Sequence, residues 1–251
     1  GGIAVFVAVY LPVILGLLLS LMHHSGILNL PDFILSYAGK HVPGIVHRAP
    51  QAIAVVAGAF LMFLTGILDD LRGLSAGKKL LMQVVAAGIA IAAGIKATLF
   101  LESDALQIAI TLIWMVGITN SMNLMDNMDG LCAGSGFIIA VIFFIVAAMT
   151  DLYFVASFLV CLAGGLLGFL PYNISPAKIF LGDAGSLVIG YTFATLTVAS
   201  TFYSTGHPLH VIVFPILVML VPIFDTLSVI IIRLRAGRSI FQADTNHFSH
   251  R

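Results

Sequence analysis

Long apolar runs separated by short polar segments make up most of this chain. A helix needs roughly 20 apolar residues to cross the hydrocarbon core of a bilayer. Runs near this length predict an all-α, polytopic membrane helix bundle with about eight transmembrane helices. The runs cover residues 3–21, 51–68, 79–95, 107–119, 131–150, 152–170, 187–203 and 210–232.

The connections between these runs are mostly short. The fourth run, 107–119, is itself short, and its helix has room to extend into the polar segment that follows. Only Thr150 and Asp151 join the fifth and sixth runs, which forces an antiparallel hairpin. The loops 22–50 and 96–106, on the opposite side, show no motif.

Composition supports an integral membrane protein. Hydrophobic residues make up 60% of the chain and charged residues 9%, whereas soluble domains are about 45–50% apolar. Lys plus Arg and Asp plus Glu number 11 each, so no basic excess indicates a nucleic-acid partner. Cys132 and Cys161 lie in apolar runs and give neither a disulfide framework nor a metal pattern.

Charge is divided unevenly between the two ends of the predicted bundle. Because each span reverses the side of the membrane, segments 69–78, 120–130, 171–186 and 233–251 must share one face. That face holds most of the 11 basic residues, and the positive-inside rule makes it cytoplasmic. It also holds seven acids, which would repel at close range without a cation or protons, so we expect a polar site there. These acids are Asp69, Asp70, Asp126, Asp129, Asp183, Asp225 and Asp244.

The most polar segment of that face spans residues 120–131. Its amides and carboxylates recur every three residues, at Asn120, Asn123, Asp126 and Asp129. Residues three apart are neighbours on a helix, so this ladder could hold a cation or hydrogen-bond a polar ligand. Placing it beside a membrane span costs free energy that a bound ligand would offset.

Asp69 and Asp70 close the second run. Adjacent helical residues point about 100° apart, so separate tasks are more natural than joint chelation of one ion. The alternative is a solvated helix end, which the helix dipole disfavours for acids. Lys79 and Gln83 follow one helical turn apart, and Lys79 could bind either lipid phosphates or a substrate phosphate.

Three further segments carry candidate chemistry. Asp183 precedes the seventh run, where it could hold Mg²⁺ near phosphate or simply cap a helix. Asp225 lies inside the eighth run, where an acid marks either a functional site or a buried polar partner. The arginines and histidines of 233–251 could bind a diphosphate or anchor the chain at the membrane surface. Four histidines in loop 22–50 match no metal-ligand spacing.

Together these motifs resemble the polyprenyl-phosphate N-acetylhexosamine-1-phosphate transferases, a family that includes the phospho-N-acetylmuramoyl-pentapeptide transferases. The resemblance covers essentially the whole chain, so residues 1–251 are expected to form a single transmembrane catalytic domain. Family members carry further N- and C-terminal spans, which we expect a longer form of the chain to supply. The matching motifs are Asp69-Asp70 with Lys79 and Gln83, Asn120-x-x-Asn123-x-x-Asp126-x-x-Asp129-Gly130-Leu131, Phe180-x-Gly182-Asp183-x-Gly185-Ser186, Pro222-x-x-Asp225 and Asp244-x-x-His247-x-x-His250-Arg251.

The resemblance implies a reaction between a UDP-linked N-acetylhexosamine and a polyprenyl phosphate at the cytoplasmic face of the plasma membrane. The products would be polyprenyl-diphospho-sugar and UMP. Mg²⁺ is the implied cofactor, with Mn²⁺ as a substitute, and the family allows a homodimer. Metal ligation is implied for Asp183, Asp69 and Asp70, and the role of base or nucleophile for Asp69, Asp70 or Asp126. The implied substrate contacts are Lys79, Asn120, Asn123, Asp129, Asn173, Phe180, Asp225, His247, His250 and Arg251.

The chain departs from the family pattern at Asn127, where glycine is common, and at Ser249, where many relatives have histidine. Its tail is closer to the branch that transfers N-acetylglucosamine 1-phosphate to start an envelope polysaccharide than to the muramoyl-pentapeptide branch. An ion-coupled transporter would also explain acids near spans, but it predicts inverted repeats and helices broken at mid-membrane. A membrane assembly scaffold predicts that the acids tolerate substitution.

Overall fold

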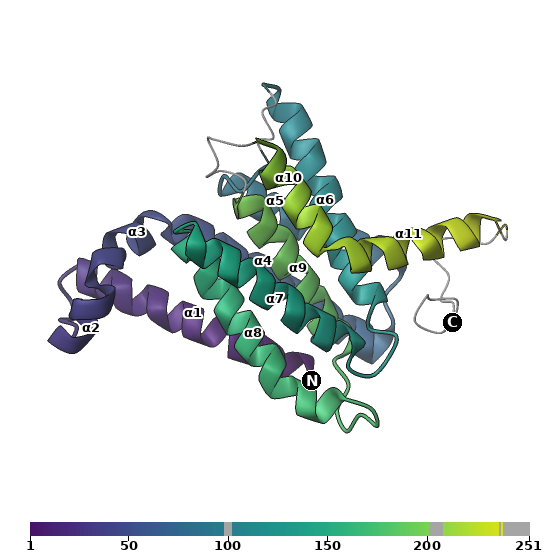
Figure 1. The fold of residues 1–251 in the computed structure, drawn as a ribbon, viewed down its shortest axis with the longest axis horizontal. Coiled ribbons are helices and arrows are strands. Elements are labelled where there is room, and N and C mark those ends of the chain that lie inside the picture. Colours follow the sequence, from purple (N-terminus) through teal and green to yellow (C-terminus); the bar gives the residue numbers. More distant parts are fainter. Residues whose placement is uncertain (98–101, 201–207, 236, 238–251) are drawn as a thin grey trace.

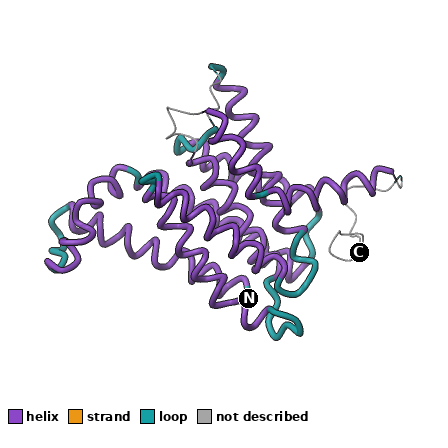
Figure 2. The backbone as a smooth tube through the Cα atoms, in the orientation of Figure 1, coloured by secondary structure: helices purple, strands orange, loops and turns teal. Residues whose placement is uncertain are grey.

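The protein is a bundle of helices in the computed structural model, which describes residues 1–97, 102–200, 208–235 and 237. Every regular element within these ranges is helical, as Figure 2 shows. The long helices are α1 (Gly2–His24), α4 (Ala49–Arg72), α5 (Ala76–Ala92), α6 (Asp104–Leu124), α7 (Leu131–Met149), α8 (Tyr153–Asn173), α9 (Gly182–Ser200), α10 (Pro208–Val218) and α11 (Leu220–Arg235).

Within the described residues, each of the eight apolar runs is helical over most of its length, which confirms the all-α class. Five helices, α1, α4, α6, α7 and α8, are long and apolar enough to cross a membrane. The chain is therefore a multi-pass membrane protein, but the expected number of about eight spans is not confirmed. The run 107–119 does extend as a helix into the polar segment that follows it, since α6 ends only at Leu124.

Two expectations are wrong, one about the last apolar run and one about the loop 22–50. The run 210–232 is divided between α10 and α11 at Met219, because proline at 222 lacks an N–H and its ring would clash with the carbonyl of residue 218. Residues 22–50 are not a plain loop. They contain α2 (Asp32–Ala38), the 3₁₀ helix η1 (Gly39–His41) and α3 (Val42–His47).

The predicted hairpin at Thr150 and Asp151 is confirmed. Helices α7 and α8 pack along each other, as Figure 1 shows in the two adjacent teal-green helices. Asp151 adopts a left-handed backbone with φ 57°, a conformation that aspartate tolerates better than most residues. The Leu152 N–H then donates to the Ala147 carbonyl at 2.8 Å and closes the turn.

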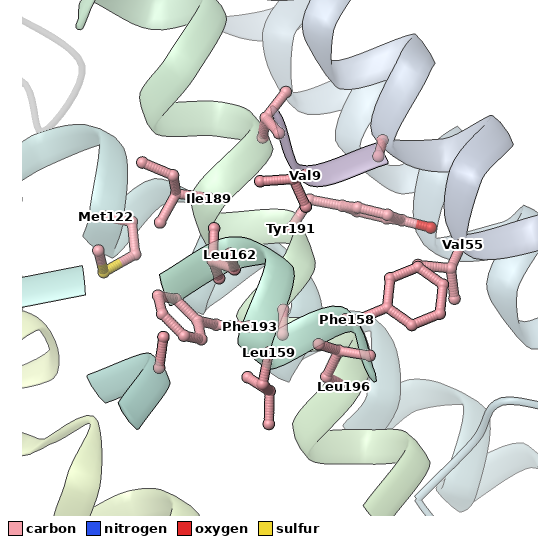
Figure 3. Close-up of a cluster of buried hydrophobic side chains, with 14 of the residues drawn as sticks. Val9, Val55, Met122, Phe158, Leu159, Leu162, Ile189, Tyr191, Phe193 and Leu196 are labelled. Carbon is pink, nitrogen blue, oxygen red and sulfur yellow. The ribbon is translucent and has the colours of Figure 1, made fainter. Parts of the chain in front are cut away.

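Helix α9 is the centre of the bundle. Every residue from Ala184 to Ala199 is buried, so α9 has no face exposed at the bundle surface. It packs most extensively against α4 and α6, and it also contacts α1. Figure 3 shows Tyr191, Phe193 and Leu196 among apolar side chains of the neighbouring helices.

Glycines let α9 approach its neighbours closely. A Cβ added to Gly66 of α4 would overlap the backbone of Asp183 and Ala184. A Cβ added to Gly190 of α9 would lie 2.7 Å from the Cα of Thr119 on α6. Small residues at such contacts are typical of helix packing in membranes. As a result, the C-terminal ends of α4 and α6 lie against the N-terminal end of α9.

Candidate active site

The polar residues singled out from the sequence gather at one end of the bundle. The C-terminal ends of α4 and α6 supply Asp69, Asp70 and Asn123, and the N-terminal ends of α5 and α9 supply Lys79 and Asp183. Direct hydrogen bonds and ion pairs join these five side chains to one another or to the backbone of α9. The alternation of chain direction anticipated this grouping, although which membrane face it occupies is a separate question.

Lys79 lies between two carboxylates. Its Nζ is 2.5 Å from Asp69 Oδ2 and 3.4 Å from Asp183 Oδ2. The Asp69 side chain is only 7% exposed and also accepts a 2.6 Å hydrogen bond from the Leu74 N–H. One ammonium group therefore offsets the repulsion between two acids on different helices. Binding of a substrate phosphate or of a lipid phosphate by Lys79 stays a prediction, since either would compete with these two carboxylates.

Asp70 serves a different purpose from its neighbour. Its Oδ1 accepts from the Asp183 N–H at 2.9 Å and its Oδ2 from the Ala184 N–H at 3.2 Å. Asp70 thus caps the N-terminus of α9 from another helix, where a negative charge also stabilises the helix dipole. The two adjacent acids therefore make separate contacts, and their separate functional tasks stay a prediction.

Gly182 makes this cap feasible. Its φ is +69°, in the left-handed region that favours glycine. A Cβ at this position would also lie 2.9 Å from Asp70 Oδ2. The glycine of the Gly182-Asp183 motif is therefore required twice, once by the backbone conformation and once by the Asp70 carboxylate beside it.

Asn123 holds the other side of Asp183. Its Nδ2 donates to Asp183 Oδ1 at 2.7 Å and lies 2.9 Å from the Ser186 hydroxyl oxygen. The Ser186 hydroxyl in turn donates to the Gly182 carbonyl at 3.1 Å. Asp183 is consequently fixed by an amide on one oxygen and by an ammonium on the other.

The ladder of residues 120–129 does not form a continuous helical stripe. Helix α6 ends at Leu124, so Asn120 and Asn123 are helical, while Asp126 and Asp129 lie on the loop 125–130. Each of the four side chains faces a different partner, which excludes a shared cation cage in this arrangement. Asn127, the departure from glycine, donates from Nδ2 to the Leu124 carbonyl at 3.0 Å and caps the end of α6.

Asn120 forms a reciprocal amide pair with Gln83 of α5. Asn120 Nδ2 donates to Gln83 Oε1 at 2.7 Å, and Gln83 Nε2 donates to Asn120 Oδ1 at 3.1 Å. Gln83 is 3% exposed. Gln83 is one turn from Lys79 and Asn120 is one turn from Asn123, so the amide pair aligns the two residues that hold Asp183.

We expect Gln83→Leu to lower both stability and activity. The substitution leaves the Asn120 amide without its partner, which costs about 1–3 kcal/mol at a buried site. Because Lys79 and Asn123 would lose their relative alignment, turnover should fall about tenfold, equivalent to 1.4 kcal/mol. The double variant Gln83→Leu/Asn120→Leu should regain thermal stability but not activity. If the single variant melts and turns over like the wild type, the pair has no positioning role.

Asp126 lies near the start of α9 among like charges. Burial, and after it the negative charges of Asp183, Asp70 and Asp129, raise the pKa of Asp126 to about 7, although a hydrogen bond from the Gly182 backbone acts in the opposite direction. A carboxyl group with a pKa near neutrality can accept or release a proton under ordinary conditions. Among the three predicted candidates for a base, Asp126 is the one without a salt bridge or an N-capping role among the described contacts.

This raised pKa gives a pH-dependent stability. The unfolded chain releases the Asp126 proton near pH 4, the folded protein near pH 7, so the folded state binds more protons in between and loses stability as pH rises. Without divalent metal, Asp126→Asn should therefore raise the melting temperature by several degrees at pH 8 and by little at pH 4.5. Scanning fluorimetry in EDTA would measure both, and an equal effect at the two pH values would contradict the assignment.

A second set of predicted residues organises the loops beside the acids. Asn173 is 3% exposed; its Oδ1 accepts from the Gly130 N–H at 3.2 Å and its Nδ2 donates to the Ile179 carbonyl at 3.0 Å. Asp129 Oδ2 accepts from the Ala177 N–H at 3.0 Å. Phe180 is 69% exposed, which leaves its ring accessible to a planar ligand. Asn173 therefore joins the loops that carry Asp129 and Phe180.

Asp225 is the one remaining predicted residue that the structure describes. Asp225 is buried on α11, which packs against α6, and none of the contacts described above joins it to Asp183. His247, His250 and Arg251 lie outside the described residues. Sequence reasoning did not predict a role for Gly66. Its signal was a glycine inside an otherwise apolar helix, a common marker of close helix packing.

The donor set limits how a metal could bind. Among the described residues, no three His, Cys, Asp or Glu side chains lie together as a ready metal cage. Mg²⁺, however, usually keeps several waters and binds through one or two carboxylates together with substrate phosphates. Asp183 and Asp69, whose carboxylates share Lys79 as a partner, match that requirement.

Comparisons with known proteins show what this chain is similar to. The family model described as "Glycosyl transferase family 4" matches residues 52–201, from the first turn of α4 to the end of α9. A "Probable undecaprenyl-phosphate N-acetylglucosaminyl 1-phosphate transferase" of Bacillus subtilis is 37% identical over 89% of this chain and 64% of that protein. A "Decaprenyl-phosphate N-acetylglucosaminephosphotransferase" of Mycobacterium tuberculosis (strain H37Rv) is 36% identical over 87% and 61%.

A "Phospho-N-acetylmuramoyl-pentapeptide-transferase" of Thermotoga neapolitana is also similar, at 38% identity over 70% of this chain and 60% of that protein. The chain thus spans less than two thirds of the length of each of these relatives. The family match alone covers more than half of the chain and contains Asp69, Asp70, Asp126 and Asp183. The chain belongs to glycosyl transferase family 4.

Proposed function

We propose that the protein transfers N-acetylglucosamine 1-phosphate from its UDP conjugate to a polyprenyl phosphate and releases UMP. The observation that carries the proposal is the fixed Asp183 carboxylate, held by Lys79 and Asn123 beside Asp69 at one end of an apolar bundle. Such a position gives access to a water-soluble nucleotide and to a phosphate whose chain lies in lipid. The names of the relatives from Bacillus and Mycobacterium supply the substrate class.

In this reaction an oxygen of the lipid phosphate attacks the sugar-linked phosphorus of the UDP-sugar. The bond from that phosphorus to the bridging oxygen breaks, and UMP leaves. We propose that Asp126 accepts the proton of the lipid phosphate, because its raised pKa keeps it near the point of half-protonation at neutral pH. Lys79 contacts the diphosphate once it exchanges one carboxylate partner for phosphate oxygens.

We propose Mg²⁺ as the cofactor, held by Asp183 and Asp69. Asp70 suits this role less well than the sequence predicted, since both of its oxygens accept hydrogen bonds from the backbone of α9. When bound, the ion supplies neutralisation of negative charge on the diphosphate. Asp183 and Asp69 then serve to fix the position of that positive charge relative to Lys79.

The uridine end of the donor would lie beside loop 125–130. Phe180 offers an exposed ring for stacking, and Asp129 offers a carboxylate oxygen on the loop that Asn173 joins to the segment before Phe180. Asn173 itself acts by positioning these loops, because its buried amide is bonded to the backbone at both ends. We further propose that this end of the bundle faces the cytoplasm, on the basis of the basic residues in the same segments.

The decisive measurement is UMP release by the full-length gene product in detergent with polyprenyl phosphate. We expect UMP with UDP-N-acetylglucosamine, dependent on added Mg²⁺ and lost in EDTA. UMP release with UDP-N-acetylmuramoyl-pentapeptide alone would instead assign the protein to the other branch, whose name one relative carries. Absence of UMP with every UDP-linked N-acetylhexosamine would overturn the proposal.

A further inference from the structure

A cavity lies at the end of the bundle opposite the acidic cluster. Its volume is about 550 Å³, within the range of small-molecule ligand sites. It is enclosed by the middle of α1, the start of α8 and the segment from η1 to the start of α4. The two sites lie at opposite ends of α1. The Gly2 N–H donates to the Leu181 carbonyl beside the active site, and Gly16, which lines the cavity, is about 20 Å further along the helix.

The walls of this cavity are mostly apolar. Pro12, Val13 and Leu17 of α1 face Phe154 and Phe158 of α8 across it. The space above Gly16 is open, because a Cβ added there would have no neighbour within 4 Å. An apolar chain could therefore lie along α1 without displacing any side chain.

The rim of the cavity is basic. Lys40, His41 and Arg48 line it, and they face one acid, Asp151. The Asp151 carboxylate accepts a 2.6 Å hydrogen bond from the Tyr153 hydroxyl, and the His41 ring lies 4.6 Å from the Tyr153 ring. The Arg48 guanidinium lies over the Phe154 ring at 5.8 Å. Positive charge at the mouth of an apolar cavity favours a ligand with an anionic head and a hydrocarbon tail.

We propose that this cavity binds one anionic phospholipid, with its headgroup phosphate at Lys40 and Arg48 and an acyl chain between α1 and α8. The lipid would join α1, the η1–α3 segment and α8, and it would stabilise the far end of the bundle. This site is separate from the transfer reaction and does not depend on the proposed function.

The test compares lipids with identical acyl chains and different headgroups. Purified wild-type protein is delipidated and incubated with phosphatidylglycerol or phosphatidylcholine, and bound lipid is counted by native mass spectrometry. We expect a single phosphatidylglycerol to be retained by the wild type. Lys40→Gln should weaken its retention about tenfold, as loss of one charged hydrogen bond predicts.

The matched pair Gly16→Phe and Gly88→Phe tests the location. Both glycines have open space where a Cβ would be, but Gly88 lies on α5, which does not line the cavity. Gly16→Phe should abolish lipid retention, while Gly88→Phe should leave it unchanged. Equal retention of phosphatidylglycerol by Gly16→Phe and the wild type, or equal retention of phosphatidylcholine, would overturn the proposal.

Discussion

Asp183→Asn should abolish measurable UMP release, with turnover falling about a thousandfold or more. The substitution keeps the size of the side chain and the contact with Asn123, but it removes the negative charge that Lys79 and the proposed Mg²⁺ require. Because the backbone cap from Asp70 is unaffected, α9 should remain in place. Steady-state kinetics with UDP-N-acetylglucosamine would measure the loss, and scanning fluorimetry would confirm that the variant is folded.

A matched control is Asp104→Asn. Asp104 begins α6 at the opposite end and forms an exposed ion pair with Lys96 at 2.7 Å. Exposed ion pairs contribute little to stability, so this variant should keep both its fold and its turnover. Asp183→Asn with more than about a tenth of the wild-type rate would contradict the central role of this carboxylate.

Gly66→Ala is expected to destabilise the protein and to inactivate it together. The new Cβ would overlap the backbone of α9 at Asp183 and Ala184, and backbone atoms cannot move aside as a flexible side chain can. Overpacking of this kind typically costs about 1–3 kcal/mol, and more where the backbone itself must shift. Since the shift would displace Asp183 from Lys79 and Asn123, activity should fall even below the melting temperature.

Gly88→Ala is the corresponding control. Gly88 lies within α5, and its added Cβ would meet no atom within 4 Å. Alanine is the better helix former by roughly 1 kcal/mol, so Gly88→Ala should leave stability unchanged or raise it slightly. The prediction for Gly66 would be refuted if the two alanine variants had the same melting temperature and the same turnover.

Much of this architecture follows from local patterns in the sequence. Apolar length located the long helices, although it did not separate α10 from α11, and the reversal of direction at each helix placed Asp69, Lys79, Asn123 and Asp183 at one end. Both inferences need only helix geometry and hydrophobicity, which act over a few residues. The family was identified from motifs that lie at the ends of those helices, and the match over residues 52–201 confirms the family.

The contacts inside the site could not be predicted in the same way. The sequence shows that Asp69 and Asp70 are adjacent, but the cap that Asp70 provides involves α9, 113 residues further along the chain. The three-residue period of Asn120 to Asp129 suggested one helical stripe, yet Asp126 and Asp129 lie on a loop because α6 ends at Leu124. The break of the last run at Met219 had a local signal in Pro222, since proline disrupts the helix one turn before it.

The complete burial of α9 has a consequence for how the protein is made. Its hydroxyl groups bind other helices: Thr192 pairs with Tyr10 at 2.6 Å, and Thr197 accepts from Trp114 at 2.9 Å. Both hydroxyls also donate to carbonyls of α9 itself, so Tyr10 of α1 and Trp114 of α6 are the groups that would lack an acceptor in lipid without α9. We expect α1 and α6, which are synthesised before α9, to reach their final packing only once α9 has inserted between them. Assembly of the membrane bundle and completion of the Asp183 site would then be a single step in biogenesis.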